Sequence, residues 1–267
     1  MKRIMSMALI IAALLSFASC GKIRNIEELR EETSAPTSTV APPVVKEKKQ
    51  KKEFKDKNGR TVYVVDVTLP EISESLEENI IRYVNDVTDK FFRDACAQAE
   101  QNIDSASEFM DKFNSDKPWK KTISFEATYV SGYFVSFLIK ESLSYYGSDG
   151  NDPSVYSRCF HVQEGNPVNA AYFTDNPDDP VTAKEYVVEL LRNSAKTDFY
   201  ELGLELDEAK LAAFEEAVTL ENFYLTEDGM TFFVVRRAID PYELSGIYTA
   251  EYTWDDLSGL FNKPELY

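Results

Sequence analysis

Residues 121–162, KTISFEATYVSGYFVSFLIKESLSYYGSDGNDPSVYSRCFHV, decide the fold class. They contain three runs rich in branched and aromatic residues, at 121–130, 133–146 and 154–162, and such runs are typical of β-strands. Short links that contain glycine join these runs, and links of this kind connect neighbouring strands that run in opposite directions. The stretch therefore predicts an antiparallel meander.

Elements on both sides of the meander complete the pattern. Period-two runs predict strands at 61–69, 223–234 and 247–254, and apolar spacings of three and four predict helices at 75–104, 182–200 and 207–218, with a helical turn at 255–261. Ser75 and Glu78 match a capping box, Pro70 is expected to end the first strand, and Asp228 with Gly229 predicts a hairpin turn in which Gly229 adopts a positive φ. Because strands and helices come in blocks, we expect an α+β fold, an antiparallel sheet with helices packed on one face.

The N-terminus, MKRIMSMALIIAALLSFASC, has the pattern of a secretory signal. Its apolar run is too short for a stable transmembrane helix. The last four residues resemble the lipobox of bacterial lipoproteins, with Phe17 where leucine is usual. The resemblance implies that residues 1–19 are removed and that Cys20 is lipidated, so that the protein is anchored to a membrane of the bacterial cell envelope and faces outside the cytoplasm. An ordinary signal peptide with a chance cysteine is the alternative.

Residues 20–53 are expected to form the lipidated Cys20 and a flexible tether, because they are rich in Ser, Thr, Pro and charge and show no helical or strand period. Its lysines either contact anionic lipids and cell-wall polymers or only keep the tether solvated; they are Lys46, Lys48, Lys49, Lys51 and Lys52. Residues 54–267 then form the folded domain, which could divide into sub-modules at 54–120 and 121–267.

The folded domain is strongly acidic. Residues 54–267 contain 19 basic and 40 acidic side chains, a net charge of −21. Such a surface repels phosphate, so we expect no nucleic-acid partner; it attracts basic partners or cations, or serves only solubility. Cys96 and Cys159 either pair outside the cytoplasm or remain two buried free thiols.

Few residues suggest catalysis, and we expect neither a cofactor nor a metal ion. His161, the only histidine, lies in a strand pattern without a nucleophile elbow, so we expect a sheet histidine that faces solvent or is hydrogen-bonded. Asp175, Asp178 and Asp179 lack EF-hand spacing and predict an exposed acidic turn. Ligand binding is instead expected at tyrosine-rich loops, although core packing is the alternative for these residues: Tyr145, Tyr146, Asp149, Tyr242 and Tyr248.

Several C-terminal positions form a recognisable set: Phe223, Tyr224, Thr226, Asp228, Gly229, Pro241, Tyr242, Glu243, Gly246 and Leu257. With these residues the chain resembles the extracellular domain of RsiV-type anti-sigma factors. The resemblance extends over roughly residues 54–262, and VTLPEI at 67–72 resembles a companion module also found on peptidoglycan deacetylases. Residues 146–150, YGSDG, stand where family members often have Gly-Gly-Ala-His.

The resemblance implies an extracytoplasmic recognition domain, because in RsiV this domain binds lysozyme, a basic protein. RsiV spans a membrane and holds a sigma factor, whereas this chain has a lipoprotein-like signal, so direct anti-sigma activity is not expected. We expect a surface-anchored, non-catalytic binding or sensing lipoprotein whose target is a cell-wall component or a basic protein such as lysozyme. The alternatives are a hydrolase or esterase of cell-wall polymers and a purely structural envelope lipoprotein.

Overall fold

The computed structural model describes residues 40–74, 76–145, 154–201, 207–235, 239 and 247–262. Residues 40–267 belong to one compact unit. Its strands are β1 (Val44–Lys55), β2 (Thr61–Ser73), β3 (Trp119–Val130), β4 (Phe134–Ser144), β5 (Ser154–His161), β6 (Asn166–Val168), β7 (Phe223–Leu225), β8 (Gly229–Val235) and β9 (Ile247–Thr253). Its helices are α3 (Glu78–Gln101), α4 (Ile103–Lys112), the 3₁₀ turn η1 (Ala170–Phe173), α5 (Pro180–Glu201), α6 (Glu208–Ala217) and α7 (Trp254–Leu257).

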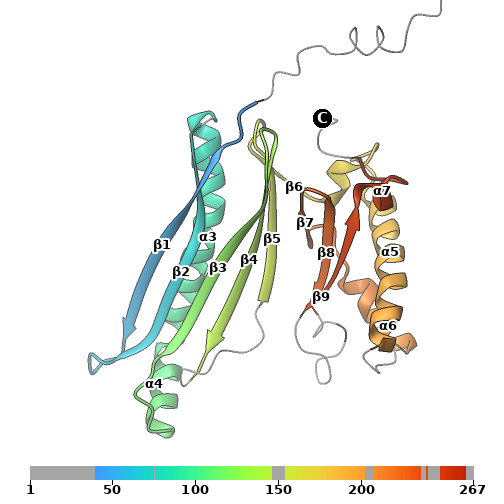
Figure 1. Cartoon of the computed structure of the whole chain (residues 1–267). Helices are drawn as coiled ribbons and strands as arrows, with labels where there is room; N and C mark the ends of the chain where they lie inside the picture. Colours follow the sequence, from blue (N-terminus) through green and yellow to red (C-terminus); the bar gives the residue numbers. More distant parts are fainter. Residues whose placement is uncertain are drawn as a thin grey trace, which may run out of the picture. The chain divides into compact units, whose positions relative to one another are not determined.

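The strands form two sheets (Figure 1). The larger sheet has the order β1-β2-β3-β4-β5-β6, and the smaller has the order β7-β8-β9. Neighbouring strands are antiparallel except β2 and β3, which are parallel because α3 and α4 lie between them in the chain. The antiparallel meander over β3, β4 and β5 is confirmed, and so is the α+β class.

Strand β4 lies between two hydrophobic cores, and each of its faces packs in a different one. Val135, Phe137 and Ile139 belong to a core with residues of α3 and β2, whereas Phe134 belongs to the core around the smaller sheet. Helix α3 packs on β2, and α5 and α6 contact β9 and β8 (Figure 1). Each sheet therefore has helices on one face, while the smaller sheet contacts the larger one through β7.

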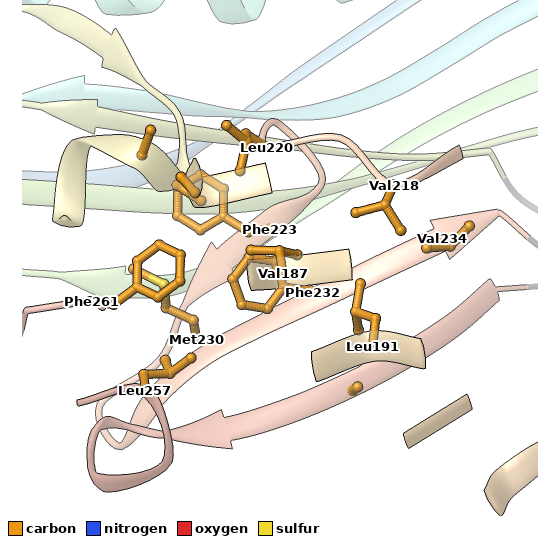
Figure 2. Close-up of a cluster of buried hydrophobic side chains, with 14 of the residues drawn as sticks. Val187, Leu191, Val218, Leu220, Phe223, Met230, Phe232, Val234, Leu257 and Phe261 are labelled. Atoms are coloured by element: carbon orange, nitrogen blue, oxygen red, sulfur yellow. The ribbon is translucent and has the colours of Figure 1, made fainter. Parts of the chain in front are cut away.

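The core around the smaller sheet is rich in large side chains (Figure 2). Phe223 and Phe232 from neighbouring strands pack with Val187 and Leu191 of α5, and all four are buried. Alternate residues of β8 point into this core, which is the period-two pattern that the sequence predicts.

Two serine side chains join the sheets. The hydroxyl of Ser136 on β4 accepts a hydrogen bond from the backbone N–H of Leu225 on β7, at 3.0 Å. The hydroxyl of Ser157 on β5 donates to the carbonyl of Glu221, at 2.6 Å. Ser136 is fully buried, so its hydroxyl fixes the position of β7 against β4 in a place where water does not compete.

The tether predicted over residues 20–53 is wrong from Val44 onward, because this part forms β1. As an edge strand with both faces largely exposed, β1 carries no apolar alternation that would show in the sequence. Its lysines form ion pairs, most of them exposed, with Asp89, Glu71, Glu74, Glu47, Glu53 and Glu100. The proposed boundary between residues 120 and 121 also falls inside β3, which pairs with β2 in the same sheet.

Pro70 does not end the first strand, because β2 continues to Ser73. The carbonyl of Pro70 accepts from the hydroxyl of Thr88, and Asn85 bonds both the N–H and the C=O of Ile72, at 2.7 and 2.9 Å. The backbone groups of Pro70 and Ile72 therefore face helix α3 rather than β1. Since Pro70 lies at a position that makes no hydrogen bond to β1, the absence of an N–H on proline does not weaken the pairing of β1 and β2.

The start of the first helix also differs from the prediction. Its N-cap is Glu77, which makes no side-chain capping bond, and Ser75 lies outside the described residues. The helical segment also breaks at Asn102 and continues as α4, beyond the expected end at residue 104.

The hairpin at 223–234 is confirmed as β7 and β8, but the expected positive φ at Gly229 is wrong. Gly229 is the first residue of β8 and pairs with Thr253 of β9. A Cβ at this position would lie 1.8 Å from the carbonyl oxygen of Tyr252. Glycine is therefore required by the close approach of β9.

Cys96 and Cys159 are free and buried. They lie in different cores: Cys96 of α3 belongs to the core with β2, and Cys159 of β5 belongs to the core around the smaller sheet. Of the two alternatives for these residues, the structure has the pair of buried thiols.

Candidate functional site: an acidic groove at the hairpin

A groove of about 610 Å³ lies where the β7–β8 hairpin, β9 and the middle of β3 meet. We call it the hairpin groove. Its lining residues are Glu126, Ala127, Thr128, Tyr224, Thr226, Asp228, Met230, Thr231, Glu251, Tyr252 and Thr253. Its volume lies within the range of small-ligand pockets and suffices for one or two protein side chains.

Strand alternation decides which side chains face the groove. On β8, Met230 and Phe232 point into the core with α5, so Thr231 points the other way. Glu251 lies opposite Thr231 in the β8–β9 register, and Tyr224 lies opposite Thr231 on β7. One cross-strand row therefore presents a phenol, a hydroxyl and a carboxylate on the face of the smaller sheet that lies away from α5.

The turn of the hairpin is held in place by three hydrogen bonds. The N–H of Thr226 donates to the carbonyl of Gly229 at 3.0 Å, and the N–H of Gly229 donates to the hydroxyl of Thr226 at 3.1 Å. The carbonyl of Asp228 accepts from the N–H of Trp254, the first residue of α7, at 3.0 Å. These bonds fix the backbone of Asp228, so its exposed carboxylate stands at the rim of the groove.

The groove is acidic. Its lining includes the carboxylates of Glu126, Asp228 and Glu251, from β3, the turn and β9, and none of the described lining residues is a Lys, Arg or His. Glu126 lies 3.5 Å from the ammonium of Lys140, but both side chains are about half exposed, so water screens this pair. The three carboxylates give the groove a negative potential that favours a cationic group.

Tyr224 gives the groove aromatic contact area. It is half-buried, and its ring lies 6.5 Å from that of Phe233. Tyr252 lies opposite Met230 in the β8–β9 register, so its side chain points to the other face of the sheet, into the core with α5, where its ring lies 6.3 Å from that of Phe232. Partly exposed tyrosines that are fixed by packing lose little side-chain entropy on binding. A carboxylate next to a tyrosine ring is also the pair of groups that receives a lysine or arginine side chain.

The tyrosines predicted as ligand contacts lie elsewhere. Tyr145 is half-buried, with its ring 4.7 Å from that of Trp119 and 5.9 Å from that of Phe109. Tyr248 is only 2% exposed and packs against Phe214, so it belongs to the core and is not available for surface contact. Neither lines the hairpin groove. Tyr146, Asp149 and Tyr242 lie outside the described residues.

The residues of the hairpin groove are not predicted as a site from the sequence. Tyr224, Thr226 and Asp228 carry only the family resemblance there. Strand alternation places Tyr224 and Glu251 on one face of their strands, and that signal could have grouped them. The contribution of Glu126 depends on how the two sheets pack, which no local pattern encodes.

His161 is hydrogen-bonded, which agrees with one of the two expectations for it. It is 8% exposed, its Nδ1 accepts from the N–H of Glu164 at 3.2 Å, and its ring lies 4.9 Å from that of Phe134. Burial lowers the pKa of His161 below its ordinary value. A neutral, buried imidazole with Nδ1 already engaged is suited to packing between Phe134 and Tyr172.

The acidic turn near residue 175 takes part in local structure. Asp179 accepts from the N–H and the hydroxyl of Thr182 in the first turn of α5, at 3.1 and 2.7 Å, and Asp175 accepts from the side-chain amide of Asn262 at 2.7 Å. Among the residues described, no group of three or more His, Cys, Asp or Glu side chains is arranged to hold a metal ion. In the residues that the structure describes, no helix is long and apolar enough to span a membrane.

Comparisons with known proteins find solved structures of similar fold. No family model matches the sequence, and no curated protein does either. A DUF3298-family protein from Bacteroides fragilis matches in structure with a TM-score of 0.53 and 14% identity, over 85% of this chain and 97% of that protein. A DUF3298-family protein from Pseudomonas aeruginosa PAO1 matches with a TM-score of 0.52 and 10% identity, over 85% of this chain and 98% of that one. The chain therefore has the fold of these DUF3298-family proteins.

Proposed function

We propose that this chain is a lipid-anchored, extracytoplasmic binding protein without catalytic activity, and that it captures a basic protein through the hairpin groove. The observation that carries the proposal is the groove's lining, in which three carboxylates meet the ring of Tyr224 and no described lining residue is basic. Lysozyme is the first partner to test, because the RsiV-type domains that the sequence resembles bind it.

The charge of the folded unit supports a basic partner. Residues 40–267 contain 24 basic and 42 acidic side chains, a net charge of −18, after the lysines of β1 are included. A field of this sign speeds the approach of a positively charged protein and repels nucleic acid and other acidic proteins. The groove then supplies the local contacts that a general negative charge lacks.

Binding can be tested with the full-length chain and lysozyme by isothermal titration at low and at physiological salt. The groove variant is Glu126→Gln/Asp228→Asn/Glu251→Gln. Its matched control, Asp104→Asn/Glu108→Gln/Asp116→Asn, removes the same charge from exposed residues outside the groove. We expect the groove variant to bind at least about tenfold more weakly, which corresponds to about 1.4 kcal/mol, and the control to bind like the wild type at physiological salt.

The outcome that refutes the proposed partner is an absence of lysozyme binding at low salt. Equal weakening by both variants would mean that net charge, rather than the groove, attracts the partner. Peptidoglycan that is retained by the chain in a pull-down, while lysozyme is not, would move the target to the cell wall.

The lipid anchor has a separate test. Cells that express the chain are fed a fatty-acid analogue, and we expect label on the wild type and none on Cys20→Ala. An unlabelled wild type, or label that survives the substitution, would show that Cys20 is not the anchor.

A further inference from the structure

A second groove lies along the outer face of α5, away from the hairpin groove. It has a volume of about 830 Å³. Its lining residues are Asn169, Pro180, Val181, Lys184, Glu185, Val188, Glu189, Arg192, Glu215, Thr219, Leu220 and Glu221. We call it the α5 groove, and it shares no lining residue with the hairpin groove.

The floor of the α5 groove is apolar. Val188 is half-buried and packs on the core around the smaller sheet, to which the buried Leu220 belongs. Val181, at the start of the helix, is 65% exposed, which is the highest value among the exposed large apolar side chains of the described residues. An apolar floor that continues the core outward is the feature of a surface that receives a partner's apolar side chains.

The residues that α5 contributes to the groove lie in a line along the helix. Val181, Lys184, Glu185, Val188 and Arg192 follow spacings of three and four, so they lie along one face of α5. From residue 180 to residue 192 this face is about 18 Å long. That length matches three turns of a partner helix, which would place apolar side chains on the floor at the same spacings.

The rim of the α5 groove is acidic on balance. It has four carboxylates, Glu185, Glu189, Glu215 and Glu221, against the cations of Lys184 and Arg192. Arg192 is paired with Glu215, so three carboxylates and one ammonium are left to face an occupant. An occupant with an apolar face flanked by lysine or arginine complements both the floor and the rim. A second copy of this chain does not, because the folded unit is itself acidic.

From the apolar floor, the helical spacing and the acidic rim we infer that the α5 groove docks an amphipathic, basic helical segment of a partner protein. The hairpin groove receives single basic side chains, and the α5 groove receives a helix about three turns long. The chain thus has two separate surfaces for basic proteins.

The probe is a fluorescein-labelled peptide of 14 residues, with leucine at one helical face and lysine elsewhere; glutamate replaces lysine in a matched peptide. Fluorescence anisotropy with the full-length protein measures affinity. We expect the lysine peptide to bind and the glutamate peptide to bind at least about tenfold more weakly. Failure of the lysine peptide to bind, or equal affinity for both peptides, overturns the inference.

Variants locate the binding. Glu185→Lys/Glu189→Lys changes exposed residues of the rim, and Val181→Lys replaces the exposed apolar residue of the floor with a cation. Both are expected to weaken the lysine peptide about tenfold or more. The matched control Glu108→Lys/Glu216→Lys makes the same charge change at exposed positions outside the groove and should change affinity less than about threefold. Equal losses in control and rim variants overturn the assignment to this groove.

The triple variant of the hairpin groove separates this inference from the proposed function. We expect it to bind the lysine peptide with wild-type affinity while it loses lysozyme. If that variant loses the peptide as well and Glu185→Lys/Glu189→Lys keeps it, the peptide occupies the hairpin groove and the α5 groove has no role.

Discussion

Gly229 is where the structure makes its sharpest prediction about stability. An added Cβ would lie 1.8 Å from the carbonyl oxygen of Tyr252, about 1.2 Å inside the 3.0 Å that real Cβ contacts respect, and 2.9 Å from Cα of Thr253. Both contacts are backbone atoms of β9, so no side-chain rotation relieves the clash. Gly229→Ala must therefore push β9 away from β8 or break their pairing.

The expected cost of Gly229→Ala is that of overpacking a tight site, about 1–3 kcal/mol. For a domain of this size each kcal/mol lowers the melting temperature by about 2–4 °C, so the melting temperature should fall by about 2–12 °C. Differential scanning calorimetry measures this shift.

Gly59 is the matched control, because it has the opposite requirement. Its φ is +80°, and a Cβ there would meet nothing within 4 Å. Asparagine tolerates positive φ better than alanine, so Gly59→Asn should be less destabilising than Gly59→Ala. At Gly229 asparagine should be at least as damaging as alanine, since the obstacle is steric. If Gly229→Asn were instead milder than Gly229→Ala, or if both melted like the wild type, the steric explanation would be refuted.

Three further predictions concern buried polar groups. Ser136→Ala leaves the N–H of Leu225 without its hydroxyl acceptor and should cost about 1–3 kcal/mol in urea unfolding, whereas Ser136→Thr, which keeps a hydroxyl, should cost less if the added methyl fits. Lys121→Met leaves the carboxylate of Glu141 without its buried partner and should lower the free energy of unfolding by about 3–5 kcal/mol. Adding Glu141→Leu should recover most of that loss. A double variant as unstable as the single one would show that the pair matters for more than its charges. Burial lowers the pKa of His161, so as pH falls below the ordinary value of 6.5 the unfolded state binds the proton before the folded state does. The contribution of His161 to stability should therefore be full above that pH and decline below it. His161→Phe should show a smaller decline in melting temperature between pH 7 and pH 5.

The elements that the sequence predicts well are those with at least one buried face. Strands β3, β4 and β5 and helices α5 and α6 lie within a few residues of their expected ranges, because burial leaves apolar residues in a run, in alternation or at three-four spacing. Strand β1 is not predicted from the sequence, because its side chains are mostly exposed on both faces and lysines stand where a half-buried strand has apolar residues.

The candidate site depends on packing that no local pattern contains. Glu126 and Glu251 meet in one groove because β7 docks on the larger sheet, where Ser136 and Ser157 fix it. The sequence marks Asp228 and Gly229 as a turn, but the reason for the glycine is β9, which lies opposite β8 only after the chain has folded. The sequence predicts Tyr248 as a ligand contact because it is an aromatic residue near the C-terminal end. It belongs to the core instead, because its ring packs against Phe214 of α6.

The most direct test of the central claim is photo-crosslinking of bound lysozyme from Tyr224. A benzoylphenylalanine at position 224 lies in the hairpin groove, and the same residue at Tyr83, which is 46% exposed on α3, is the control. We predict a covalent adduct with lysozyme from position 224 and none from position 83. Lysozyme that binds but is not crosslinked from position 224, or is crosslinked equally from position 83, would contradict the assignment of the hairpin groove as the binding site.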